Sequence, residues 1–165
     1  MADAGPVPET DRVREALRVY VKLLRAGKSV LARLEPGLSA EGLTATQFGV
    51  LEAILHKGPL TQRELLRKVL TSPGNMTDVV DKLARRGLVS RARSAADRRA
   101  VTVDLTAEGR ALIEALFPRH ARDIAATMDT LTHSELQELG RLLRKLGGAA
   151  GPALADPSSD GHDRT

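Results

Sequence analysis

Apolar residues along the first quarter of the chain recur mostly at intervals of three, four or seven positions. Between Asp11 and Leu34 the positions that share this spacing are Val13, Leu17, Tyr20, Leu24, Leu31 and Leu34. Such a period places these residues on one face of a long helix. The next five residues, 35–39, include a proline and a glycine, which are the two residues least compatible with a helix interior. We therefore predict that this helix ends near Leu34.

Polar residues at fixed spacing predict where four later helices begin. In a capping box, a Thr side chain accepts the backbone N–H three residues on, and a Glu or Gln at that position reaches back. The sequence has this arrangement at 44–47, 61–64 and 132–135. Ser72 followed by Pro73 predicts another start, because Ser caps well and Pro lacks the N–H that a first turn leaves unpaired. Glycines predict the ends of three of these helices, at positions 58, 87 and 147–148.

The spacing of the apolar residues changes from nearly four to two in two short runs, at 88–93 and 101–105. This alternation predicts two β-strands, and the polar loop 94–100 between them predicts a hairpin with a basic tip. A helix resumes near Thr106, and Pro118 within it is a candidate kink because it lacks a backbone N–H. The order of elements predicts a mainly α fold with a small β-hairpin, namely a winged helix-turn-helix.

The division of the chain follows from the same pattern. We interpret residues 10–147 as one domain, with a DNA-binding lobe at about 44–106, and residues 1–9 and 148–165 as disordered tails. The amphipathic helices on either side of the lobe carry more apolar surface than the lobe can cover. We therefore expect N- and C-terminal dimerisation helices, and a homodimer.

Composition and charge narrow the function. The 165 residues contain no cysteine, which excludes disulfides, thiol redox sensing and zinc-thiolate sites. No apolar run approaches the roughly 20 residues that span a bilayer, and no signal peptide is recognisable, so we expect a soluble, cytoplasmic protein with no membrane partner. The net charge is +4, but residues 61–99 hold ten Lys and Arg against four Asp and Glu. A basic segment within the winged unit predicts a DNA-binding surface.

Five stretches of the sequence resemble the multiple-antibiotic-resistance regulator (MarR) family, at residues 43–51, 60–65, 74–83, 86–89 and 97–106. The last of these reads Asp-Arg-Arg-Ala-Val-Thr-Val-Asp-Leu-Thr. The resemblance extends over about residues 11–147. It implies a dimer of intertwined terminal helices, a recognition helix from about Ser72 to Arg86 and a wing arginine in the minor groove. It also implies transcription regulation, in many members by repressors that small phenolic or anionic ligands release.

The candidate DNA contacts lie on the two capped helices and the wing. By its place in the resemblance, Arg99 is the candidate for the minor groove and Arg98 for a phosphate, although either can instead pair with Asp97. Arg85 and Arg86 fit DNA contact and a solvated helix end equally well, since cations there complement the helix dipole. We predict DNA contacts from Thr61, Gln62, Ser72, Asn75, Met76, Thr77, Lys82, Arg91, Arg93, Arg98 and Arg99. Capping by Ser72 and ordinary solvation of Arg91 and Arg93 are the alternatives.

Other chemistry has less support. Tyr20, Phe48 and His56 are candidate ligand-binding residues, although packing explains them equally. The histidines are dispersed and lack metal-ligand spacing, and no nucleophile elbow or phosphate-binding glycine loop is present, so we predict no metal, no cofactor and no enzyme.

The leading hypothesis is a transcription regulator, a repressor released by a small phenolic or anionic ligand, that binds an inverted-repeat operator in double-stranded DNA. The alternatives are a winged-helix or architectural DNA-binding protein without ligand response, and a protein-interaction module. The basic segment argues against the module.

Overall fold

The computed structural model describes residues 10–69, 71–93 and 101–148, which form six helices and three short strands. In chain order these are α1 (Asp11–Ser39), α2 (Ala45–Lys57), β1 (Leu60–Thr61), α3 (Gln62–Lys68), α4 (Pro73–Arg85), β2 (Val89–Arg93), β3 (Val101–Leu105), α5 (Ala107–Met128) and α6 (His133–Gly148). The predicted winged helix-turn-helix class is confirmed. The predicted tails, 1–9 and 148–165, lie outside the described residues except for position 148.

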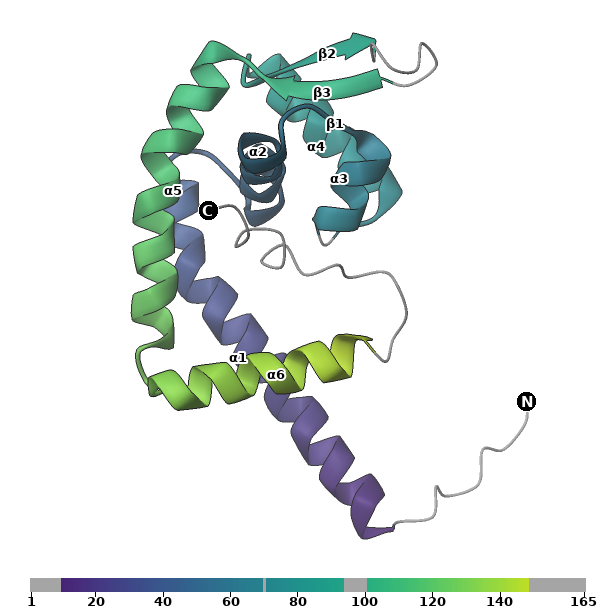
Figure 1. Ribbon diagram of the computed structural model, residues 1–165, viewed down its shortest axis with the longest axis vertical. Coiled ribbons are helices and arrows are strands. Elements are labelled where there is room, and N and C mark those ends of the chain that lie inside the picture. The colour runs from purple at the N-terminus through teal and green to yellow at the C-terminus, as the bar shows by residue number, and fades with distance from the viewer. Residues whose placement is uncertain (1–9, 70, 94–100, 149–165) are drawn as a thin grey trace, which may run out of the picture.

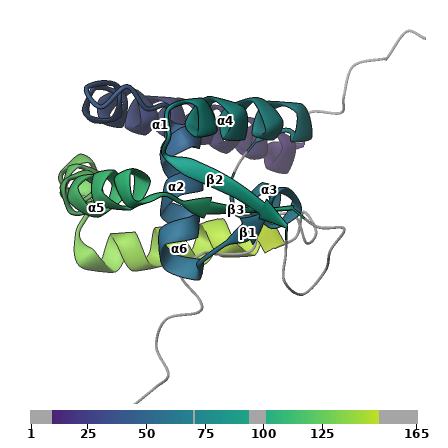
Figure 2. The same cartoon turned by 90° about the horizontal axis from the view of Figure 1, so that it is seen from above.

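The three strands form one antiparallel sheet in the order β1-β3-β2 (Figure 2). β2 and β3 are the predicted hairpin, with Val89 opposite Leu105. The two-residue β1 was not predicted, and it pairs Leu60 with Val103. All four of these side chains are buried, so the sheet closes one side of the core.

The predicted helix starts are confirmed. They could be predicted from the sequence because each cap joins residues only three positions apart. At the start of α2, Thr44 Oγ1 accepts the Gln47 N–H at 3.2 Å, and Gln47 Oε1 accepts the Thr44 N–H at 3.0 Å. Equivalent caps begin the other helices, at Thr61–Glu64, Ser72–Asn75 and Thr132–Glu135. Gly58 and Gly87 follow α2 and α4 with φ of 76° and 70°, as their predicted roles require.

The predicted end of the first helix was wrong, because α1 continues from Leu34 through Pro36 to its last turn. Pro36 removes one N–H, but its carbonyl still accepts the N–H of Ala40 at 3.1 Å. Leu38 in this last turn is only 2% exposed. Burial of Leu38 therefore outweighs the local cost of the proline, and Gly42, with φ of 64°, ends the turn.

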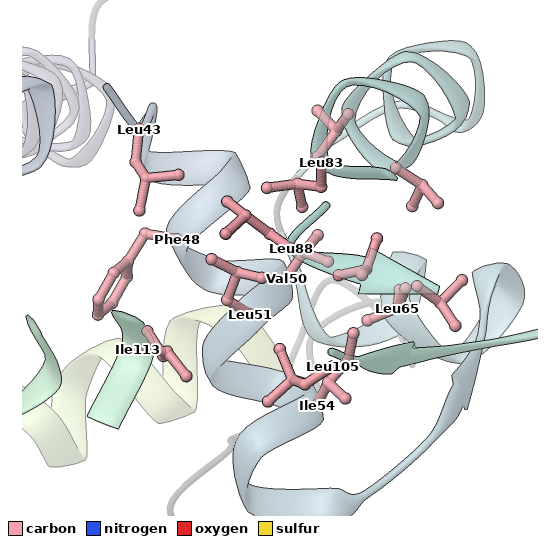
Figure 3. Close-up of a cluster of buried hydrophobic side chains, with 14 of the residues drawn as sticks. Leu43, Phe48, Val50, Leu51, Ile54, Leu65, Leu83, Leu88, Leu105 and Ile113 are labelled. Atoms are coloured by element: carbon pink, nitrogen blue, oxygen red, sulfur yellow. The ribbon is translucent and has the colours of Figure 1, made fainter. Parts of the chain in front are cut away.

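The core of the DNA-binding lobe lies around α2 (Figure 3). Figure 3 labels Leu51 and Ile54 of α2, Leu83 of α4, Leu105 of β3 and Ile113 of α5, which all belong to this one buried cluster. Burial of one such side chain contributes about 1.5–3 kcal/mol, so this cluster is the main source of the lobe's stability.

The N-terminal half of α1 and the whole of α6 lie outside this core. Figure 1 shows α1 extending well beyond the lobe and α6 turning away at the end of α5. No residue of α6, which is described throughout, is buried, and the helix includes both glycines that were predicted to end it. Large exposed apolar side chains on the two helices include Leu17, Tyr20, Leu24, Leu31, Leu136, Leu139, Leu142, Leu143 and Leu146.

Candidate DNA-binding surface and ligand cavity

Helix α4 has two chemically different faces. Met76 has no exposed surface and packs in the lobe core with the other apolar residues of the helix. The predicted DNA contact from Met76 must therefore be corrected, because a fully buried side chain cannot reach a base. Asn75, Thr77 and Lys82 are exposed on the other side of the helix. The core thus fixes which face of α4 is presented outward.

The first turn of α4 is held by its own polar side chains. Ser72 Oγ accepts the Asn75 N–H at 3.3 Å, and Asn75 Nδ2 donates to Thr71 Oγ1 at 2.5 Å. Thr77 Oγ1 lies 3.4 Å from the Pro73 carbonyl, to which it donates. The same turn carries the positive end of the helix dipole, which favours an anionic group nearby.

Thr61 and Gln62 stand at the start of α3 and are half-buried. Thr61 Oγ1 accepts the Glu64 N–H at 3.3 Å and donates to the Glu64 carboxylate at 2.7 Å, which also accepts the Thr61 N–H at 2.7 Å. These bonds from the Thr61 backbone and side chain lower the pKa of Glu64. A contact from Thr61 to DNA has to share a hydroxyl that already caps the helix.

Two of the predicted cationic contacts lie beside acidic residues of α4. The Arg91 guanidinium on β2 is ion-paired with Asp81, and Lys82 Nζ lies 3.8 Å from Asp78. All four side chains remain at least one-third exposed, so these pairs contribute little stability and leave the cations accessible to a phosphate. Arg85 bonds within its own helix, from Nε to the Asp81 carbonyl at 3.4 Å.

Arg86 fits neither of its two sequence interpretations. Its Nη1 donates to the Gly42 carbonyl at 2.6 Å, and its Nη2 donates to the Glu41 carbonyl at 3.0 Å. Both acceptors lie in the loop between α1 and α2, more than 40 residues away in the chain. The side chain therefore joins two elements of the fold.

The tip of the wing, 94–100, lies outside the described residues. Arg93 is on β2 opposite Val101. Arg98 and Arg99 belong to the tip, so their predicted contacts, and the choice of which enters the minor groove, stay predictions.

A cavity of about 540 Å³ opens between α1, α2 and α5, a volume typical of small-molecule sites. Its walls are mostly apolar, with Lys28 and Glu35 from α1 as charged groups at its edge. The rings of Phe48 and His120 lie 4.4 Å apart at a tilt of 56° and form one side. The lining residues are Lys28, Leu31, Ala32, Leu34, Glu35, Leu38, Ser39, Leu43, Thr44, Ala45, Phe48 and His120.

Of the three candidate ligand-binding residues, Phe48 lines this cavity and the other two do not. Tyr20 is exposed on the N-terminal half of α1. The ring of His56 packs edge-on against Phe117 at 5.0 Å. His120 was not singled out from the sequence, because a lone histidine in a helix carries no local signal. Its burial and its contact with Phe48 become visible only when α5 packs on α2.

An acidic residue of α2 lies close to two histidines. Glu52 is one helical turn from both Phe48 and His56 on α2. Partial burial raises the pKa of Glu52, and the nearby His56 and His120 lower it in part. Ionised Glu52 is therefore a cost to the folded state that the two histidines reduce.

The described residues offer no other obvious site. Across 10–69, 71–93 and 101–148, no three His, Asp or Glu side chains gather closely enough to bind a metal ion. Over the same ranges, no helix is both long and apolar enough to cross a bilayer.

Comparison with known proteins gives consistent matches. The MarR family model matches residues 43–101. The HTH-type transcriptional regulator MhqR of Bacillus subtilis is 32% identical over 133 residues, which are 81% of this chain and 92% of MhqR.

Two solved structures extend the likeness to three dimensions. One is BpsR of Bordetella bronchiseptica, whose DNA binding is regulated by 6-hydroxynicotinic acid. It has a TM-score of 0.72 and 30% identity over 79% of this chain and 98% of that chain. The other is a mutant MarR of E. coli in complex with operator DNA, with a TM-score of 0.74 and 28% identity over 83% of this chain and 99% of that chain.

Proposed function

Because this chain belongs to the MarR family of DNA-binding transcription regulators, we propose that it is a homodimeric repressor of an inverted-repeat operator, released by a small aromatic anion. The observation that carries the proposal is the orientation of α4. Its apolar face is fixed in the lobe core by Met76, so its polar face is held outward and ready for the major groove. The protein acts in this proposal on cytoplasmic DNA.

The proposed contacts follow from the accessible groups. Asn75 and Thr77 are short polar side chains of the kind that read base edges, and Lys82 is within reach of a phosphate. Thr61 and Gln62, at the start of α3, are proposed to contact the DNA backbone. Arg91 and Arg93 lie on β2, the strand that precedes the tip of the wing. Ser72, Arg98 and Arg99 complete the proposed set.

The dimer is supported by the exposed leucines on α1 and α6. Leu31 and Leu146 are 61% and 58% exposed in the protomer, and their neighbours form long apolar stripes. Stripes of this extent normally mark an interaction surface. A two-fold dimer would place two recognition helices about 34 Å apart, which is one turn of DNA.

The chemistry of the cavity supports an aromatic anion as ligand. Phe48 and His120 offer ring faces, and Lys28 offers a cation in a mostly apolar lining that also includes Glu35. The related BpsR responds to 6-hydroxynicotinic acid, which is such a molecule. A ligand releases DNA only if it has higher affinity for the conformation that cannot bind the operator than for the conformation that can.

Selection from a random duplex DNA pool tests the operator. We expect an enriched inverted repeat with half-sites about one turn apart, bound at least about 1000-fold more tightly than scrambled DNA. Lys82→Ala should lower the salt slope of binding by about one, while Arg110→Ala, on α5, leaves it unchanged. Weak binding without an enriched motif would leave an architectural protein or an interaction module.

Thermal unfolding with 6-hydroxynicotinic acid and related aromatic carboxylates tests the ligand. We expect stabilisation by at least one of them, lost in Lys28→Ala and retained in Lys22→Ala, a lysine outside the cavity lining. A regulator without ligand response would bind the operator equally well in the presence of every compound.

A further inference from the structure

The side chain of Arg86 connects the end of the recognition helix to the end of α1. Arg86 is the C-cap residue of α4, and its backbone N–H bonds to the carbonyls of Lys82 and Ala84. Its guanidinium spans to the Gly42 and Glu41 carbonyls at 2.6 and 3.0 Å. The backbone of α4 and the backbone after α1 are thus held by opposite ends of one residue.

The acceptors are arranged for a guanidinium. Two neighbouring carbonyls take two nitrogens of one planar group, which a lysine ammonium cannot reproduce with the same geometry. Gly42 turns the chain with φ of 64°, and a Cβ atom there would lie 3.7 Å from the Arg86 guanidinium nitrogens. A Cβ would make ordinary van der Waals contact with Arg86 there, so the positive φ, and not lack of space, favours glycine at position 42.

Helix α5 also contacts the end of α1 and the loop after it. Arg119 Nη1 lies 3.7 Å from the Glu41 carboxylate, and Arg119 Nη2 donates to the Gly37 carbonyl at 3.4 Å. Arg86 thus binds the main chain of Glu41 while Arg119 binds its side chain. This segment also supplies cavity wall, through Leu38, Ser39, Leu43, Thr44 and Ala45.

We propose that Arg86 is a positioning residue that fixes the angle between α4 and α1. In this proposal, filling the cavity changes the orientation of the recognition helix through the two hydrogen bonds of Arg86 to the Glu41 and Gly42 carbonyls. Arg86 makes no contact with DNA in this account. The effect on DNA rests on the proposed operator-binding dimer, whereas the effect on the interhelical angle does not.

A distance measurement tests the angle directly. The chain has no cysteine, so Lys22→Cys and Gly74→Cys place two spin labels, one on α1 and one on α4. A Cβ at Gly74 meets nothing within 4 Å, and Lys22 is exposed. Dilution with unlabelled protein leaves only the distance within one chain. We expect this distance distribution to shift and broaden in Arg86→Ala, to change less in Arg86→Lys and to stay the same in the control Arg85→Ala.

The control removes the same charge from the adjacent position, where the side chain bonds only within its own helix among the interactions described. Circular dichroism of every variant shows whether α4 is still formed. A distribution in Arg86→Ala that matches the wild type would overturn the proposal.

Operator affinity separates positioning from direct contact. We expect Arg86→Ala to weaken binding about tenfold with an unchanged salt slope, because no phosphate contact is lost. A slope lower by about one would make Arg86 a phosphate ligand and overturn the proposal. If no operator is selected by the wild type, the proposed function fails, and the distance measurement still decides the role of Arg86.

Filling the cavity tests the second part. Ala45→Trp adds an indole to the cavity wall without any ligand, and we expect it to weaken operator binding. In the Arg86→Ala background the same substitution should have no further effect, because the connection is already broken. Additive losses, or no effect of Ala45→Trp in the wild-type background, would show that the cavity does not act through Arg86.

Discussion

The DNA-binding lobe and the two flanking helices use the same apolar residue, leucine, in opposite ways. In the lobe, Leu51, Leu65 and Leu83 have no exposed surface. On α6, Leu136 is 36% exposed and Leu146 is 58% exposed. The lobe therefore completes its core within one protomer, whereas the flanking helices have apolar faces that the described part of the protomer leaves exposed. Stability of the lobe and assembly of the protein should respond to different substitutions.

The largest effect should come from a charge on the proposed dimer surface. Leu24→Glu places a carboxylate on the apolar stripe of α1, where a partner would leave it buried and unpaired. We expect the dissociation constant of the dimer to rise about 1000-fold, which corresponds to about 4 kcal/mol. Sedimentation over a concentration series measures it.

Two controls show whether the loss of the dimer comes from the apolar stripe itself. Lys22→Glu, which puts the same group on the polar side of α1, should leave the dimer intact. Hydrogen exchange should still protect the amides of α2 in the Leu24→Glu monomer, because the lobe core needs no partner. A dimer that persists in Leu24→Glu would show that the stripe is not the interface.

A glycine gives the next largest effect, this time within the lobe. A Cβ on Gly109 of α5 would lie 1.9 Å from the Leu88 carbonyl oxygen, so Gly109→Ala forces α5 away from the sheet. We expect a loss of about 3 kcal/mol in the free energy of unfolding, measured with urea. At Gly140 of α6 a Cβ meets nothing within 4 Å, so Gly140→Ala should instead gain about 0.5–1 kcal/mol. Equal effects at the two glycines would contradict the comparison.

The same division explains which parts of the fold the sequence predicts. Helix starts at Thr44, Thr61 and Ser72 depend on residues three apart, so their prediction needed no tertiary information. The end of α1 depends on Leu38, whose burial requires packing against distant elements. A prediction from Pro36 alone therefore ended this helix too early. The strand β1 was missed because two residues cannot show a period and its partner, β3, is more than 40 positions away.

The site follows the same logic. Polar residues of α4 were correctly recognised as a surface, but the DNA contact assigned to Met76 was wrong. The spacing of Met76 with Val79, Val80 and Leu83 already places it on the apolar face of the helix. His120 was not assigned a role, and neither interpretation of Arg86 included a bond to the loop after α1, since their partners Phe48 and Gly42 lie far away in sequence. Contacts of that kind arise from packing and leave no local trace.

Removal of a helix cap should have a smaller effect on stability, and the two regions each offer one cap to compare. Thr106 Oγ1 donates to the Gly87 carbonyl at 2.6 Å and accepts the Gly109 N–H at 3.0 Å, both partly buried. Thr106→Ala removes the cap and leaves that carbonyl unpaired, so we expect a loss of about 1.5 kcal/mol. Thr132→Ala removes the exposed cap of α6 and should cost about 0.5 kcal/mol. Urea unfolding at one protein concentration measures both, and a larger loss at Thr132 would reverse the expected ranking.

The smallest effect concerns two carboxyls whose pKa values move in opposite directions. Burial raises the pKa of Glu52 in the lobe, whereas hydrogen bonds from Thr132 lower the pKa of Glu135 on α6. Folded Glu52 holds its proton to higher pH than the unfolded chain does, so its contribution to stability is present at low pH and lost as pH rises through the raised value. Glu52→Gln should therefore be more stable than the wild type at pH 8, with a smaller gain at pH 5.

Glu135 contributes stability above its unfolded pKa and loses it as pH falls, so Glu135→Gln should be less stable than the wild type at pH 8, with a difference that disappears in acid. Thermal unfolding of both variants and the wild type from pH 4 to 8 gives, for each variant, the slope of its stability difference from the wild type against pH. Opposite signs are expected because one carboxyl is partly buried against the lobe and the other is fully solvated at a helix start. Slopes of the same sign would mean that His56 and His120 more than offset the burial of Glu52, so that ionised Glu52 stabilises the folded state.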